Sequence, residues 1–177
     1  MRNAQSPARR WVLVVRNRQR TRRVNTKLLR ELADWVLEGP LRASEVELCV
    51  HLVGEAEISA LNWDFLEHAG STDVITFDQR EEPQSATGAR AEAAPVFHGE
   101  IFISVDDAVA QAKRFRTTWQ SELARYVIHG LLHLAGHDDL QPTARQRMKR
   151  QENRLLKLAT AEFPLRCLAI CNLQSAI

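Results

Sequence analysis

The chain has 177 residues, of which 45% are hydrophobic and 26% charged, and its formal net charge is +2. These are ordinary values for a globular protein that builds a core without disulfide staples, so we expect one compact domain over residues 1–177. No apolar run approaches the roughly 20 residues that span a bilayer, and the N-terminus lacks the apolar stretch of a signal peptide. We therefore expect a cytoplasmic protein with no membrane contact.

The hydrophobic pattern predicts four strands. The first is the β-branched run at 11–15, and the second is the alternating segment at 46–53. The other two are predicted at 73–77 and 100–104, on either side of a mobile loop at 79–95 that is rich in Glu, Ala, Ser, Gly and Pro.

Apolar residues at helical spacing predict five helices, which lie at 25–38, 56–65, 105–115, 119–135 and 143–163. The first of them ends at Gly39-Pro40, a typical helix stop. Strands with helices between and after them indicate the α+β class. We expect a single layered domain with a roughly four-stranded mixed sheet.

Basic residues are concentrated at the start of the chain. Residues 1–30 contain ten Lys or Arg and no acid. Such a block favours a polyanionic partner, usually RNA or DNA, although a solvated arm is the alternative. The predicted RNA-binding side chains are Arg16, Arg18, Arg20, Arg22 and Arg23.

The three cysteines, Cys49, Cys167 and Cys171, are odd in number and unevenly spread. This pattern argues against a disulfide framework and against a disulfide-linked partner. Cys167 and Cys171 could share a helix face, but with no further Cys or His nearby they are weak evidence for zinc.

Two histidines on the predicted helix 119–135 carry the main functional signal. His129 and His133 are four residues apart, so both imidazoles lie on one helix face and can bind one metal ion. Two partly buried structural histidines are the alternative for such a pair alone. Aliphatic neighbours would exclude water from one side of the pair. Gly136 is placed to end the helix at positive φ and turn the chain back.

The predicted third ligand is Asp139, which the returning chain can bring to the same ion. The spacing His-x3-His-x2-Gly-x2-ligand is that of the metzincin zinc site, in which the third position is a His. His137 is the rival, but it lies only one residue past the glycine. Asp138 is expected to orient an imidazole or brace the turn. Two imidazoles and one carboxylate suit a single Zn²⁺ with an open position, although such a set also accepts other divalent ions.

The chemistry predicted for this site is phosphodiester hydrolysis. Gly130 stands where a metallopeptidase places the glutamate that serves as its general base. With a basic segment in the same chain, we expect metal-bound water to act on a phosphodiester. The sequence identifies no general base. Asp73, at the start of a strand, is the one candidate, and the sequence favours a structural role for it over a catalytic one.

At this point the chain resembles the YbeY-type endoribonucleases, also called ribosomal RNA maturation factors. Residues 129–139 match most of their hallmark, His-Gly-x-Leu-His-Leu-x-Gly-Tyr-Asp-His. Residues 72–77 are similar to their Thr-Asp-Val-Leu-Ser-Phe, and residues 99–104 to their Gly-Asp-Ile-x-Ile-Ser. The resemblance spans roughly residues 11–161.

This resemblance implies an α+β fold and a zinc-dependent endoribonuclease of single-stranded RNA, with His129 and His133 as zinc ligands. It also implies action on ribosomal RNA precursors and the small ribosomal subunit, in RNA 3′ end maturation and ribosome quality control. The chain departs from the family pattern at three positions. Asp139 replaces the third His, His137 replaces a Tyr, and Leu66 replaces an Arg that has been treated as part of RNA handling or catalysis.

Two other functions remain open from the sequence. A zinc-stabilised ribosome assembly factor that binds RNA with little turnover fits the absence of a glutamate at Gly130 and of an arginine at Leu66. A metallopeptidase is the third possibility, and Gly130 disfavours it.

Overall fold

One mixed sheet organises the fold. The computed structural model describes residues 10–80 and 94–170. The strands β1, β2 and β4 are parallel, and β3 runs antiparallel to β4, in the sheet order β1-β2-β4-β3. Their bounds are β1 Trp11–Asn17, β2 Glu45–Val53, β3 Val74–Asp78 and β4 Val96–Ser104. The predicted α+β class with a four-stranded mixed sheet is confirmed.

Five α-helices follow the predicted ranges to within two residues at each end. They are α1 Thr26–Glu38, α2 Glu55–Leu66, α3 Val105–Phe115, α4 Trp119–Leu134 and α5 Pro142–Glu162, and a short 3₁₀ helix, η1, spans Leu165–Leu168. The main correction concerns β4, which begins at Val96 and not at residue 100. His98 and Gly99 interrupt the apolar alternation there, but the backbone still pairs with β2. Most of the loop predicted at 79–95 lies outside the described residues.

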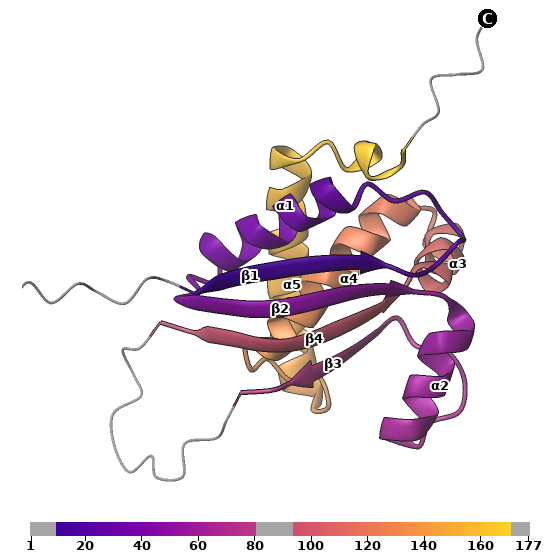
Figure 1. Cartoon of the computed structure of the whole chain (residues 1–177), viewed down its shortest axis with the longest axis horizontal. Coiled ribbons are helices and arrows are strands. Elements are labelled where there is room, and N and C mark those ends of the chain that lie inside the picture. Colours follow the sequence, from indigo (N-terminus) through magenta and orange to yellow (C-terminus); the bar gives the residue numbers. More distant parts are fainter. Residues whose placement is uncertain (1–9, 81–93, 171–177) are drawn as a thin grey trace, which may run out of the picture.

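The main core lies on one face of the sheet, where α1, α4 and α5 pack (Figure 1). Among the described residues, the other face is covered only at one end, by α2 (Figure 1). There a smaller apolar cluster joins Ile58 of α2 to Val53, Ile75 and Phe102 of the sheet. The helix α4 is therefore held from two sides, by the sheet and by its neighbouring helices, which makes it a rigid support for a site.

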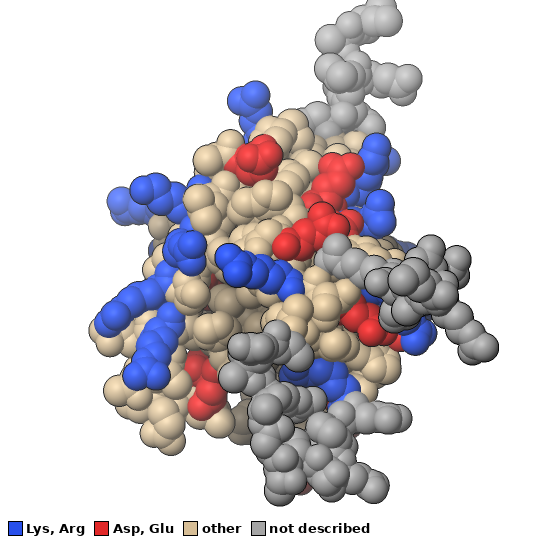
Figure 2. Space-filling view, turned by 90° about the vertical axis from the view of Figure 1, so that its left-hand side faces the viewer, with Lys and Arg blue, Asp and Glu red and all other residues tan. Residues whose placement is uncertain are grey.

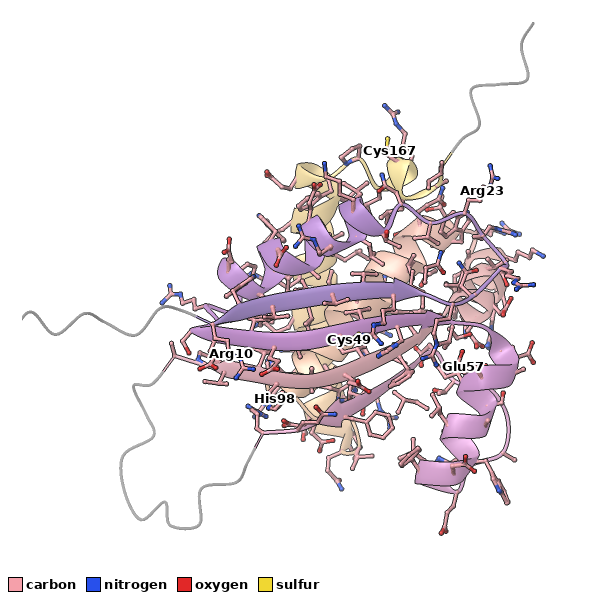
Figure 3. All side chains as sticks on the ribbon, viewed as in Figure 1. Arg10, Arg23, Cys49, Glu57, His98 and Cys167 are labelled. Carbon is pink, nitrogen blue, oxygen red and sulfur yellow. The ribbon has the colours of Figure 1, made fainter. Side chains whose placement is uncertain are left out.

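None of the helices in the described ranges is both long enough and apolar enough to cross a membrane. The two cysteines within those ranges, Cys49 and Cys167, are free. Figure 3 shows Cys49 in the middle of the sheet and Cys167 beyond α1, beside η1. Cys171 lies outside the described residues.

Candidate metal centre

The helix α4 presents His129 and His133 on the same face. Side chains on its other sides, among them Val127, Ile128 and Leu131, are fully buried in the core. The two imidazoles are half-buried, and their Nε2 atoms lie 3.1 Å apart. The packing of the apolar side thus fixes the direction in which both rings point.

The chain turns directly after α4 and brings a carboxylate to the two rings. Gly136 has φ of +87°, as the sequence predicted, and the N–H groups of Gly136 and His137 donate to the carbonyls of His133 and Leu132. The carboxylate oxygens of Asp139 then lie 4.0 Å from Nε2 of His129 and 4.0 Å from Nε2 of His133. Among the described residues, these three form the group of side chains that could hold a metal ion.

The rival ligand His137 and the predicted brace Asp138 both form hydrogen bonds within the turn. The backbone carbonyl of His137 accepts a hydrogen bond from Nδ1 of His133 at 3.1 Å. Asp138 accepts one from the backbone N–H of Leu140 at 2.9 Å. Both residues therefore position the ligand candidates from outside the group of three.

Nδ1 of each imidazole has a hydrogen-bond partner, and that partner determines whether Nε2 carries a hydrogen or a lone pair. Nδ1 of His133 faces a carbonyl, and Nδ1 of His129 lies 3.0 Å from Oε2 of Glu152. Both partners are acceptors, so each neutral ring carries its hydrogen on Nδ1 and a lone pair on Nε2. Two lone pairs then face each other at 3.1 Å. A cation between them removes that repulsion, and a set of two imidazoles and one carboxylate fits zinc.

The pKa values of the two histidines shift in opposite directions. Burial alone would lower the pKa of His129, but the hydrogen bond and the charge of Glu152 outweigh it, so the pKa is raised overall. Burial lowers the pKa of His133, and the neighbouring His129 lowers it further. Burial would raise the pKa of Glu152, but hydrogen bonds from His129 and Arg125 bring it below its usual value. Glu152 is therefore a carboxylate at neutral pH and keeps the proton of His129 on Nδ1.

Glu152 is the functional residue that the sequence analysis missed. It is only 8% exposed and comes from the middle of α5, where Nη1 of Arg125 also donates to it at 2.5 Å. The sequence does carry one signal. Glu152 falls on the buried stripe of α5, four residues after Met148 and three before Leu155. A carboxylate on an apolar stripe needs a buried partner, and here that partner is a ligand candidate.

Packing against the sheet explains why position 130 is a glycine, which the sequence alone did not reveal. A Cβ at this position would lie 2.7 Å from Cγ2 of Ile101 on β4. Position 130 therefore faces the sheet and leaves no room for a side chain. A glutamate placed there, as in a metallopeptidase, would enter the core and not the metal centre.

A cavity of about 410 Å³ opens beside the metal centre, and His129 and Asp139 form part of its wall. Asp73 lines it as well, and its charge is one of the causes that raise the pKa of His129. Asp73 also has a local role, because its Oδ1 accepts hydrogen bonds from the backbone N–H of Val74 and the hydroxyl of Thr72. The structure therefore places Asp73 both at the start of β3 and beside the site.

The five arginines predicted to bind RNA lie outside the described wall of this cavity. Arg18 forms an ion pair with Glu57 of α2, and Arg23 lies on the connection between β1 and α1 (Figure 3). None of the five belongs to the part of the cavity wall that the structure describes.

A second basic surface lies on α5, and the sequence analysis did not single it out. Figure 2 shows Lys and Arg side chains gathered along one side of the face that it presents. Two basic residues of α5, Arg145 and Lys149, line the cavity beside the metal centre. The exposed basic residues of α5 are Arg145, Arg147, Lys149, Arg150, Arg154 and Lys157.

Sequence comparison identifies the family of the chain. The sequence model of the family described as "Endoribonuclease YbeY" matches residues 14–160. The chain belongs to the YbeY family. Among its relatives, the Endoribonuclease YbeY of Salinibacter ruber is 36% identical over 113 residues, which cover 64% of this chain and 70% of that protein. The one from Myxococcus xanthus is 40% identical over 116 residues, which cover 66% of this chain but only 37% of the relative.

The fold has a solved counterpart. The solution structure of TM1509 from Thermotoga maritima superimposes with a TM-score of 0.60 at 25% sequence identity. The match covers 93% of this chain and 100% of the other. The match of the family model over residues 14–160 confirms membership of the YbeY family, which the three motifs indicated.

Proposed function

We propose that this protein is a zinc-dependent endoribonuclease that cuts single-stranded RNA. The observation that carries the proposal is the pair of Nε2 atoms of His129 and His133, which face each other at 3.1 Å with both Nδ1 atoms hydrogen-bonded. The family supports the reaction class, because its relatives are called endoribonucleases.

The residues that would hold zinc are His129, His133 and Asp139. When bound, the metal supplies a Lewis acid for a phosphoryl oxygen and lowers the pKa of water towards about 7. Three protein ligands leave a position open, as in catalytic zinc sites.

The remaining chemistry falls to side chains around the cavity. Arg145 and Lys149 bring positive charge to its wall and suit the phosphates of an RNA backbone. Arg145 is held there by a hydrogen bond of 2.9 Å from its Nε to the backbone carbonyl of Asp139. Asp73 presents a carboxylate in the same cavity and is the group that would accept a proton from the attacking water. Glu152 keeps His129 in the tautomer that a metal ligand requires.

We further propose that the substrate is a ribosomal RNA precursor, cut near the 3′ end of the small-subunit RNA, and that the enzyme serves ribosome quality control in the cytoplasm. This part rests on the family resemblance of the three motifs. The basic segment with Arg16, Arg18, Arg20, Arg22 and Arg23 supports it, because a structured RNA extends well beyond one cavity.

One observation favours a second candidate function, an RNA-binding assembly factor with little turnover. Leu66 ends α2 and is 49% exposed at the position where the resemblance implies an arginine. If an arginine is needed there, a Leu66→Arg variant should cut RNA faster than the wild type. An unchanged rate would show that this chain does not depend on it.

The test is cleavage of a labelled single-stranded RNA by the purified full chain, with zinc and with EDTA. We expect cleavage that EDTA stops and that His133→Ala removes. The variant His68→Ala, which changes an exposed histidine outside the site, is the control and should cut normally. Cleavage that survives both EDTA and His133→Ala would not depend on this site and would overturn the proposal.

A further inference from the structure

The cavity beside the metal centre contains two buried polar atoms that make no hydrogen bond within the described residues. They are the hydroxyl of Tyr126 and Oε1 of Gln111. Tyr126 is only 4% exposed, and both residues line the cavity. Buried polar groups are nearly always satisfied by protein or by ordered water, so these two atoms are available to a molecule that takes the place of water in the cavity.

The two atoms come from neighbouring helices and lie close to the reaction centre. Tyr126 precedes His129 by three residues on α4, so the two side chains share one helix face. Gln111 belongs to α3, and Phe115, one turn later, lines the same cavity with 59% of its surface exposed. The buried side chain of Met148 contributes a second apolar wall. The cavity therefore combines an exposed aromatic ring with hydrogen-bonding groups behind it.

Charge decides which part of an RNA strand fits inside. The carboxylate of Asp73 lines the cavity and would repel a phosphate, whereas those of Glu122 and Glu152 are paired with Arg125. A neutral base with N–H groups avoids that repulsion. The phosphates would instead bind at the metal centre and at Lys149, on the basic side of the cavity.

We propose that the cavity binds the base of a nucleotide next to the scissile phosphate, with Tyr126 and Gln111 reading its edge. Oε1 of Gln111 accepts from an N–H of the base, and the hydroxyl of Tyr126 bonds the neighbouring acceptor or donor. Phe115 offers a face on which the base stacks. Single-stranded RNA is recognised by such a combination of stacking and edge contacts. This inference rests on the proposed RNA substrate and adds to it a preference among bases.

The test is the binding of short, labelled homopolymer RNAs of uridine, cytidine and adenosine to the full chain, by fluorescence anisotropy, with zinc and again in EDTA. The variants are Tyr126→Phe and Gln111→Met, which remove the polar atoms and keep the shape. The control is Gln120→Met, because Gln120 also lies on α4 but lines a different hollow. The ratio of the weakest to the strongest Kd is the readout, since backbone contacts contribute equally to all three strands.

We expect the wild type to prefer one base and each variant to reduce that ratio by about fivefold, the worth of one hydrogen bond. The control should leave it unchanged. The unfolding temperature of Tyr126→Phe should not fall, because no hydrogen bond within the protein is lost; a purely structural tyrosine would give the opposite result.

Equal binding of the three RNAs by the wild type, or an equal loss for all three in the variants, overturns the base site. If RNA is still cut, the proposed function survives that result. If no RNA binds, both the base site and the proposed function are overturned.

Discussion

Oε2 of Glu152 lies 3.0 Å from Nδ1 of His129, although the two residues are 23 positions apart in the sequence. The contact joins α5 to α4 and fixes the tautomer of the imidazole. The same carboxylate accepts from Arg125, so its charge is balanced inside the protein. The strength of the metal centre therefore depends on a residue that is not itself a ligand candidate.

Replacing Glu152 by Gln should weaken zinc binding by about 10- to 100-fold, the usual effect of losing a partner of a ligating histidine. The amide removes the negative charge that raises the pKa of His129. Competition with a chromophoric chelator measures the affinity. The matched control is Glu162→Gln, which changes an exposed glutamate at the end of the same helix. Equal affinities for the two variants would contradict the role of Glu152.

Gly130→Ala should destabilise the fold. Its Cβ would meet Cγ2 of Ile101 at 2.7 Å, and overpacking of this kind costs about 1–3 kcal/mol. The better helix propensity of alanine offsets about 1 kcal/mol of that cost. Urea unfolding should therefore show a net loss for the variant.

Ile101→Ala serves as the partner variant, because it removes the clashing atom. The double variant should lose less stability than the sum of the two single variants, by about 0.5 kcal/mol or more. Strict additivity, or a Gly130→Ala variant more stable than the wild type, would mean that α4 does not pack as closely on β4 as described.

His51 should make the protein less stable in mild acid. Burial is the main cause that lowers the pKa of His51 below 6.5, and Arg18 and Arg16 add to it, while Glu100 opposes it. The unfolded chain therefore takes up this proton more readily than the folded chain. Stability is then fully present above the unfolded pKa and declines as the pH falls through about 6.5.

The measurement compares urea unfolding at about pH 7.5 and about pH 5.5 for the wild type and for His51→Phe, which keeps a ring against Phe102. The stability lost between the two pH values should be smaller in the variant. His68→Gln, at an exposed histidine, should lose as much as the wild type. A loss in His51→Phe as large as in the wild type would assign the acid sensitivity to other groups.

Lys149→Gln should reduce both RNA affinity and its dependence on salt. For single strands each phosphate contact contributes about 0.7 to the slope of log K against log salt concentration, so the slope should fall by about that amount. It should also slow cleavage at saturating RNA, because Lys149 lines the cavity beside the metal centre. Arg20→Gln should change the slope alone, since the described cavity wall does not include Arg20. If the two variants slow cleavage equally, the cavity is not where RNA is cut.

The local parts of the centre follow from the sequence because they depend on neighbouring residues. Spacing alone places His129 and His133 on one helix face, and the Schellman turn at Gly136 follows from the only residue that adopts positive φ without strain. Asp139 comes to the site through that same turn. The helix limits are equally local, since Asn25 and Thr118 cap α1 and α4 through their own side chains.

The remaining parts depend on contacts between distant segments, which a single sequence does not specify. Glu152 reaches His129 only because α5 packs on α4, and Gly130 is required only because Ile101 of β4 lies beneath it. The order of the strands is a further case, since β3 pairs with β4 at the sheet edge while β2 lies between β1 and β4. The base-binding cavity belongs to this class as well, because its wall combines residues of α3, α4 and α5.

The metal content of the purified protein, measured by plasma mass spectrometry, tests the central claim most directly. The wild type, Asp139→Ala and His137→Ala should be purified side by side without chelators. The geometry of His129, His133 and Asp139 predicts about one zinc per chain in the wild type and in His137→Ala, and a loss of zinc in Asp139→Ala. A wild type without stoichiometric metal, or a loss confined to His137→Ala, would contradict it.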